Sequence, residues 1–208
     1  MKNLKGKFVT IEGCEGVGKS TQIELLKDYC AKNIIDAVFT REPGGTPIAE
    51  RIRHIILDPS GGEMDNIAEL LLYAASRAQH INETIAPALK LGKTVFCDRF
   101  SDSTIAYQAY GRGLDLATVE NVCAVASKGI AIDYTIFLDL NPVDGFSRVA
   151  ARGNAVDRLE QAGLEFHGRV YKGFSELSKK HASRFIVVDA SLSANGVHNN
   201  IINQLFKG

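Results

Sequence analysis

Residues 13–20 have the composition and spacing of a phosphate-binding loop. The segment reads GCEGVGKS and matches G-x-x-x-x-G-K-[ST] at every fixed position. Gly13, Gly16 and Gly18 permit backbone angles that a Cβ would forbid, so successive N–H groups can converge on a polyphosphate. Lys19 adds a mobile positive charge, and Ser20 offers a hydroxyl to a magnesium ion. The loop therefore predicts a site for the phosphates of a nucleotide, with the N-terminus of the following helix directed at them.

An acidic and a basic residue follow the strand expected at Thr94–Cys97. A carboxylate at the carboxyl end of a central strand, near such a loop, usually steadies the magnesium ion or its water, which makes Asp98 a candidate. Arg99 can grip a phosphate with its planar guanidinium. The alternative is a purely structural ion pair between these two neighbours.

Two further segments carry side chains suited to a planar, hydrogen-bonding ligand. Glu69, Tyr73 and Arg77 recur every four residues and fall on one stripe of a helix. The segment Ser101–Gly113 mixes hydroxyls, an amide, two tyrosines and an arginine, as a binding pocket does. For the stripe, solvent-facing charges beside a core tyrosine remain the alternative.

Residues Arg148–Gln161 (RVAARGNAVDRLEQ) contain three arginines with Gly153 among them. A glycine-hinged arginine segment is typical of a lid that closes over phosphates. An ordinary solvated helix end is the alternative.

The elements that must position these residues alternate along the chain. Apolar runs predict strands at Lys7–Glu12, Ala37–Arg41, Thr94–Cys97, Asp133–Leu140 and Arg184–Asp189. Helices are expected at Lys19–Lys32, Ile48–Leu57, Glu63–Leu91 (with a bend near Asn82 or Pro87), Leu116–Lys128, from Pro142 into the lid, Gly163–His181 and Asn195–Phe206. This alternation predicts an α/β fold in which helices cover both faces of a five-stranded parallel sheet. The stiff segment EPGGTP after the second strand is either a ligand-holding loop or a plain turn.

Composition narrows the class of protein. The 208 residues favour one domain, 1–208, with a lid at about 148–162, and the 24 basic residues equal the 24 acidic ones. No overall charge attracts nucleic acid or a membrane surface, and no apolar run approaches the ~18 residues that span a bilayer, so we expect a cytoplasmic protein. The four cysteines are scattered and the five histidines form no close group, which argues against a zinc site, a disulfide framework or a Ser/His/Asp triad.

The phosphate loop alone leaves GTPases, partition ATPases, helicase motors and small-molecule kinases open. No N-K-x-D occurs, and Cys14 stands where partition ATPases carry a lysine. Several segments together resemble bacterial thymidylate kinase, a P-loop nucleoside monophosphate kinase family: TREPGGT at Thr40–Thr46, YAASRAQ at Tyr73–Gln79, DRF at Asp98–Phe100, STIAYQAYGRG at Ser103–Gly113, and the lid with its DRLE. The resemblance covers nearly the whole chain.

The resemblance implies a P-loop kinase that transfers the γ-phosphoryl group of ATP to dTMP with Mg²⁺, giving ADP and dTDP for dTTP synthesis, usually as a homodimer. It assigns ATP binding to Gly13, Cys14, Glu15, Gly16, Val17, Gly18, Lys19, Ser20 and Thr21. It assigns dTMP binding to Glu12, Arg41, Pro43, Tyr73, Arg77, Arg99, Ser103, Thr104, Tyr107 and Gln108, with Arg99 on the phosphate, Tyr73 beside thymine and Tyr107 against the sugar 2′ position. Metal ligands are expected at Ser20, Asp98 and Glu12, and catalytic roles at Lys19, Arg99, Arg152, Arg148 and Glu12.

The charge-neutralising arginine is expected in the lid, because the variable loop positions hold Cys14, Glu15 and Val17 and therefore no arginine. Arg152 is the first candidate and Arg148 the second. Related lids often carry another arginine where this chain has Ala150. Two alternatives stay open at this point: another P-loop nucleoside or nucleotide kinase with a different acceptor, and a nucleotide-binding switch that hydrolyses ATP or GTP slowly.

Overall fold

Five parallel strands form the sheet at the centre of the fold. The computed structural model describes residues 4–61, 63–151 and 158–207. The strands are β1 (Phe8–Glu12), β2 (Ala37–Arg41), β3 (Thr94–Asp98), β4 (Tyr134–Asp139) and β5 (Phe185–Asp189), and their spatial order is β2-β3-β1-β4-β5. All pairings are parallel. The predicted α/β fold with a five-stranded parallel sheet is confirmed.

The central strand β1 and its neighbour β3 are buried because helices cover both faces of the sheet. All five residues of β1 are buried, and β3 is buried from Thr94 to Cys97. Apolar side chains from Phe8 to Ile11 suit this environment, and the one hydroxyl in that run, Thr10, contacts the hydroxyl of Thr135 on β4 at 3.1 Å. The sheet edge that carries the site therefore rests on a rigid, dehydrated support.

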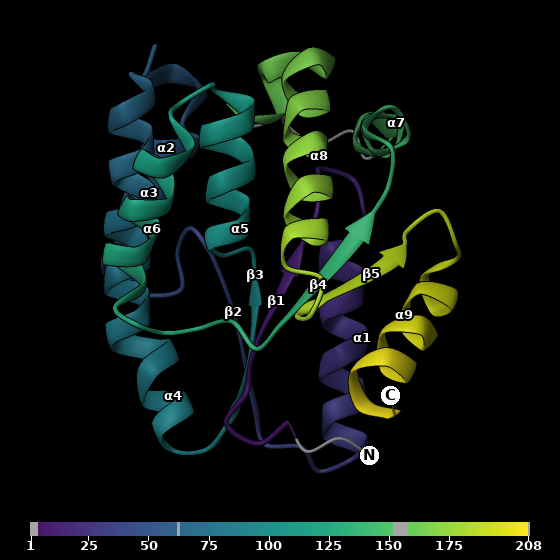
Figure 1. The fold of residues 1–208 in the computed structure, drawn as a ribbon. Helices are drawn as coiled ribbons and strands as arrows, with labels where there is room; N and C mark the ends of the chain where they lie inside the picture. The colour runs from purple at the N-terminus through teal and green to yellow at the C-terminus, as the bar shows by residue number, and fades with distance from the viewer. Residues whose placement is uncertain (1–3, 62, 152–157, 208) are drawn as a thin grey trace.

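Two groups of helices lie on opposite sides of the sheet (Figure 1). On one side, α1 (Lys19–Lys32) packs against β2, β3 and α9 (Ala194–Ile202), which itself contacts β5 and continues as a π-helical turn at Asn203–Lys207. On the other side, α8 (Gly163–Lys180) packs along the helical segment formed by α5 (Ser101–Thr104) and a π-helical stretch at Ile105–Gly111. The polar segment predicted to line a pocket is thus a helix that packs against α8 and the helix at Leu116–Ser127.

A second layer of helices extends from that side. Helix α2 (Pro47–Leu57) packs on α3 (Asn66–His80), which packs on α6 (Leu116–Ser127), and a short 3₁₀ turn at Pro59–Gly61 follows α2. The predicted start of the long helix at Glu63 is wrong: Asp65 caps α3 by accepting the N–H groups of Ile67 and Ala68. The predicted bend is a π-helical turn at Ile81–Ile85, after which α4 (Ala86–Lys90) completes the stretch.

Helix α7 (Pro142–Ala151) follows β4 at the carboxyl edge of the sheet (Figure 1). A 3₁₀ turn at Glu160–Ala162 leads into α8. The predicted lid therefore falls partly outside the described residues, because 152–157, including Arg152 and Gly153, are not among them. Within the described part of the chain, no helix combines the length and apolarity needed to cross a membrane.

Candidate active site

A cavity of about 240 Å³ opens at the carboxyl edge of the sheet, where ligands bind in folds of this kind. Six segments contribute to it: the loop after β1, the end of β2 with its loop, α2 with α3, the end of β3, the helical segment from α5, and the turn before α8 that contains Leu159. Its lining consists of Glu15, Gly16, Val17, Gly18, Lys19, Ser20, Arg41, Glu42, Pro43, Arg53, Leu57, Tyr73, Arg77, Asp98, Arg99, Phe100, Ser103, Thr104, Tyr107, Gln108 and Leu159. The phosphate loop and the predicted base-binding residues thus face one space.

The loop after β1 has the conformation that its glycines predict. Gly13, Gly16 and Gly18 have φ values of 145°, 74° and 92°, in the region that favours glycine. Helix α1 starts directly after Gly18 with no side-chain cap and no acidic residue in its first turn, so its N-terminal N–H groups remain available to an anion. The Lys19 ammonium donates to the carbonyl oxygens of Gly13 (3.1 Å) and Cys14 (2.9 Å). Burial, together with Arg99, lowers the pKa of Lys19.

Glu15 points across the cavity to the predicted acceptor side. Its Oε1 accepts Arg99 Nη2–H at 2.6 Å and the Tyr107 hydroxyl at 2.8 Å. Burial alone would raise the pKa of Glu15, but the positive charges of Arg99 and Lys19 lower it to about 2. The ion pair of Arg99 is therefore with Glu15, and the alternative of a local pair with Asp98 is not what the structure contains.

Glu12 lies beneath the cavity and is not among its lining residues. It is fully buried, its Oε1 accepts the N–H of Phe100 at 2.7 Å, and its Oε2 accepts the Ser103 hydroxyl at 2.5 Å. Burial and the nearby Asp102 raise the pKa of Glu12 to about 8, although Ser103, Arg99 and Phe100 act in the opposite sense. In this arrangement Glu12 supports Ser103, and the metal and substrate contacts predicted for it would require a different rotamer.

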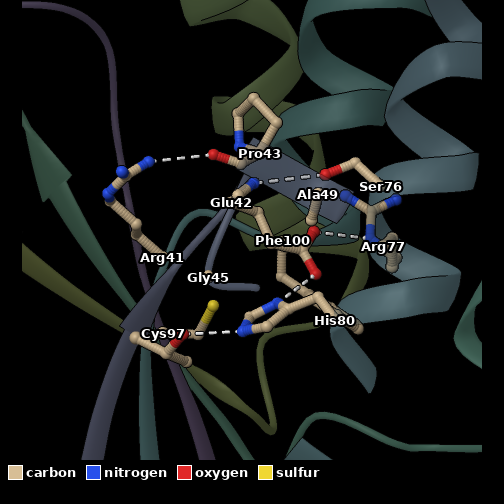
Figure 2. Close-up of polar contacts among 12 residues, drawn as sticks. Arg41, Glu42, Pro43, Gly45, Ala49, Ser76, Arg77, His80, Cys97 and Phe100 are labelled. Carbon is tan, nitrogen blue, oxygen red and sulfur yellow. Dashed lines mark hydrogen bonds and ion pairs between the residues drawn. The ribbon is translucent and has the colours of Figure 1, made fainter. Parts of the chain in front are cut away.

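The predicted base-binding residues come together on the opposite wall. Tyr73, Arg77, Thr104 and Gln108 all line the cavity, and Arg77 is only 2% exposed. Arg77 donates through Nε to Glu42 at 2.8 Å (Figure 2). It also donates through Nη2 to the Thr104 hydroxyl at 2.9 Å. Its guanidinium also lies 4.7 Å from the centre of the Phe100 ring. These contacts fix its plane, while its role on a base stays a prediction.

Glu69, the remaining residue of the predicted stripe, does not line the cavity and instead supports residues that do. Its buried carboxylate accepts hydrogen bonds from Gln108 (3.0 Å), Arg112 and Arg158. Burial would raise the pKa of Glu69, and these donors lower it. Glu69 thus holds Gln108 in place and joins it to Arg158, which lies in the predicted lid.

Two predicted site residues on the loop after β2 are found at the cavity. Arg41 donates to the Pro43 carbonyl at 3.1 Å and to Glu50 at 2.9 Å, and both Arg41 and Pro43 line the space. This loop therefore faces the cavity, and its role in holding a ligand stays a prediction. Its cis Glu42–Pro43 peptide was not predicted.

The predicted metal ligands Ser20 and Asp98 line the same cavity. Asp98 Oδ1 is buried and has no hydrogen-bond partner among the described residues, as expected of an oxygen that awaits a cation or its water. The described part of the chain contains no group of three or more His, Cys, Asp or Glu side chains arranged to hold a metal. Mg²⁺ fits this setting, because it takes few protein ligands and fills its other positions with water and substrate phosphate.

Several predicted residues lie away from the lining. Gly13, Cys14 and Thr21 do not line the cavity, and Arg148 donates to the Ala190 carbonyl at 3.1 Å. Arg152 lies outside the described residues, so the catalytic roles of both lid arginines stay predictions.

Sequence reasoning missed some cavity residues: Glu42, Arg53, Leu57, Phe100 and Leu159. Glu42 and Phe100 could have been found, because each directly follows a residue already assigned to the site at a strand end. Arg53, Leu57 and Leu159 carried no such signal.

Comparison with known proteins settles the family. The family model described as thymidylate kinase matches residues 11–201. The chain belongs to the thymidylate kinase family. That match includes the phosphate loop, the segment that contains Glu42 and the helical segment that contains Gln108.

Individual thymidylate kinases are similar over nearly their full length. A thymidylate kinase of Pelotomaculum thermopropionicum is 45% identical over 199 residues, which is 96% of this chain and 92% of that protein. One of Carboxydothermus hydrogenoformans is 49% identical over 186 residues, covering 89% and 90%. The crystal structure of thymidylate kinase from Ehrlichia chaffeensis superposes with a TM-score of 0.79 at 33% identity, covering 96% of this chain and 98% of that one. The P-loop kinase fold predicted from sequence is therefore confirmed.

Proposed function

We propose that this chain transfers the γ-phosphoryl group of ATP to dTMP, giving ADP and dTDP. One observation carries the proposal: a phosphate loop and a group of polar and aromatic side chains suited to a nucleobase line one cavity of about 240 Å³. Phosphoryl transfer requires positioning and charge neutralisation more than covalent chemistry from the protein. A cavity lined by both groups of residues supports that reaction.

On the donor side, the uncapped N-terminus of α1 and the loop from Gly13 would bind the ATP phosphates. Lys19 would leave the Gly13 and Cys14 carbonyls to reach the β- and γ-phosphate oxygens. Ser20 and Asp98 would hold Mg²⁺ directly or through water, and the ion would neutralise charge that develops on the phosphates.

On the acceptor side, Arg99 would bind the dTMP phosphate. Its guanidinium is already fixed by the Gly13 carbonyl (3.0 Å), the Ser103 hydroxyl (3.0 Å) and Glu15, so little entropy is lost when the phosphate arrives. Tyr107 would lie against the sugar, held there by its hydrogen bond to Glu15.

Tyr73, Arg77, Thr104 and Gln108 would receive thymine on the opposite wall. Arg77 and Gln108 are braced by Glu42 and Glu69, so their remaining donors and acceptors have defined directions. Such a wall supports selection of the base by hydrogen-bond geometry.

The lid would supply the arginine that neutralises the transferring group, with Arg152 the first candidate and Arg148 the second. No residue of the loop itself can do this, since positions 14, 15 and 17 are Cys14, Glu15 and Val17. If Arg152→Ala keeps normal turnover while Arg148→Ala loses it, the assignment must be reversed.

A homodimer is also part of the proposal. Helices α2, α3 and α6 pack side by side and carry large apolar side chains that stay exposed, with Ile55 and Leu71 each 54% and Val125 81% exposed. A second copy of the chain would cover them. Light scattering coupled to gel filtration tests this, and a monomeric mass at micromolar concentration would contradict it.

The acceptor panel tests the function itself. ADP release is measured with ATP, Mg²⁺ and each of dTMP, dUMP, dCMP, dAMP and thymidine. The proposal expects the highest kcat/KM for dTMP. A preference for another acceptor would identify a different kinase, and hydrolysis that no acceptor stimulates would indicate a nucleotide-binding switch.

A further inference from the structure

A buried polar cluster joins the base-binding wall to His80 and Thr40, which do not line the cavity. Its centre is His80 of α3, which is fully buried and lies beside Glu42 of the loop after β2 (Figure 2). His80 Nδ1 is 3.1 Å from Glu42 Oε1, and His80 Nε2 is 2.6 Å from the hydroxyl of Thr40 on β2. Nothing in the phosphoryl-transfer scheme uses this imidazole.

The partners determine where the protons lie. The Glu42 carboxylate accepts hydrogen bonds, so His80 Nδ1 must carry the hydrogen that joins them. The charge of Glu42 is already balanced by Arg77, and a cationic imidazole would add an unpaired buried charge. With Nδ1–H directed at Glu42, Nε2 can accept the hydrogen of the Thr40 hydroxyl, 2.6 Å away.

Glu42 is held at both oxygens by different residues. Oε1 accepts from His80, and Oε2 accepts Arg77 Nε–H at 2.8 Å. Two anchors prevent the carboxylate from rotating about its last torsion, and this in turn fixes the plane of the Arg77 guanidinium. At the other end of the guanidinium, Arg77 Nη2–H donates to the Thr104 hydroxyl at 2.9 Å.

The loop is shaped to accept the imidazole. Gly45 has a φ of 86°, and a Cβ built on it would lie 2.6 Å from His80 Nε2. Ser76, one turn before His80 on the same helix, accepts the Gly44 N–H at 3.2 Å. Helix α3 thus holds this loop at two points, and the absence of a side chain at Gly45 leaves room for the ring.

We propose that His80 is a positioning residue for acceptor recognition: it fixes Glu42 and, through Glu42, the orientation in which Arg77 meets the nucleobase. This rests on the proposed function, in which Arg77 faces the base. His80 contacts no substrate itself.

Steady-state kinetics with dTMP and ATP varied separately tests the proposal on four variants. His80→Leu removes both hydrogen bonds, whereas His80→Asn keeps a donor near the Nδ1 position. Thr40→Val removes only the hydroxyl, and Thr40→Ser keeps it. For His80→Leu, KM for dTMP should rise about tenfold or more, as for a lost hydrogen bond to a charged group, while KM for ATP stays within about twofold.

The KM of each matched variant for dTMP should depend on which hydrogen bonds the variant retains. His80→Asn should restore most of the dTMP affinity lost in His80→Leu. Thr40→Val should raise KM for dTMP about threefold, and Thr40→Ser should match the wild type. A folded His80→Leu variant with unchanged KM for dTMP, or an equal rise in both KM values, would overturn the proposal.

A spectroscopic measurement keeps the test decisive if His80→Leu does not fold. Long-range ¹H–¹⁵N correlation spectra of the wild type should show the Nδ1-protonated neutral tautomer at His80, and the Nε2-protonated tautomer would refute it. The wild-type acceptor panel separates the two levels of inference. Rapid turnover of dTMP with unaffected His80 variants refutes only the His80 inference, whereas no turnover of dTMP refutes the proposed function.

Discussion

The ion pair between Glu15 and Arg99 can be tested by removing one charge while keeping the shape. In Glu15→Gln the side chain retains an oxygen that can accept from Arg99 and Tyr107, so the lost term is mainly electrostatic. The pKa of Glu15 falls from an ordinary 4.5 to about 2 in the folded protein, because the attraction of Arg99 and Lys19 outweighs burial. A shift of that size contributes about 3 kcal/mol at pH 7. The side chain is 20% exposed, so this is an upper figure.

The sign of the pH dependence follows from the lowered pKa. The contribution is complete above pH 4.5 and is lost as the pH falls toward 2, because the unfolded chain takes up the proton first. Urea unfolding should therefore show Glu15→Gln less stable than the wild type by up to about 3 kcal/mol at pH 7, and by about a third less than that at pH 3.5.

A control on a neighbouring element defines the background. Glu24 of α1 is 71% exposed in its pair with Lys27, so Glu24→Gln should change stability by less than about 0.5 kcal/mol. Equal stability of Glu15→Gln and wild type at pH 7 would refute the reasoning. A difference that stays constant between pH 7 and pH 3.5 would assign the loss to packing instead of charge.

Three further substitutions probe the supports of the site. A Cβ on Gly145 would lie 2.3 Å from the Glu15 carbonyl oxygen, so Gly145→Ala should displace the phosphate loop and lower kcat about tenfold or more. The control Gly168→Ala should leave kcat unchanged, because no atom of the described residues lies within 4 Å of the added Cβ. Equal kcat values for the two variants would contradict the prediction. Burial raises the pKa of Glu12 to about 8 in the folded protein. The protonated carboxyl therefore stabilises the folded protein fully below pH 4.5, and this stabilisation is lost as the pH rises toward 8. Between pH 5.5 and 8.5 the wild type should lose about 3 kcal/mol that Glu12→Gln does not lose, so the Tm of the variant should rise by about 10 °C relative to that of the wild type. A constant difference in Tm would exclude the pKa shift. Asp98→Asn should raise the Mg²⁺ concentration for half-maximal activity about tenfold, since the orphaned oxygen loses its charge, and an unchanged requirement would argue against a role at the metal.

Local patterns were enough to predict the fold and the phosphate loop. The bounds of α1 and β2 agree with the expected ones to the residue, and β1 starts one residue after its predicted start at Lys7. These elements follow from apolar periodicity and from glycine at positions that demand positive φ, both of which act over a few residues. The start of α3 was predicted less well. Helical periodicity alone allows the helix to begin at Glu63, but the Asp65 side chain caps its N-terminus, so that the helix begins at Asn66.

The directions of the carboxylates could not be predicted. Glu15 was assigned to ATP by its place in the loop, yet it reaches Arg99, which is 84 residues away in sequence. The Glu42 partner Arg77 is 35 residues away, and the partners of Glu69 lie on two other elements. Spacing places a residue on a face or at a strand end, but the cation that reaches it from another element is decided by tertiary packing.

The pairing of each arginine explains how the acceptor wall can be both charged and stable. Arg77 and Arg99 are 2% and 16% exposed, and removing the partner of such a buried cation would cost roughly 3–5 kcal/mol. Glu42 and Glu15 supply that partner before any substrate is present. In the proposed function, the wall would attract dTMP less through net charge than through guanidinium planes held in fixed orientations. A phosphate bound to Arg99 would share it with Glu15, whereas a base that met Arg77 would leave its pair with Glu42 intact. The phosphate contact would then be exchangeable and the base contact rigid, as a site requires that must release a diphosphate product while it recognises one base.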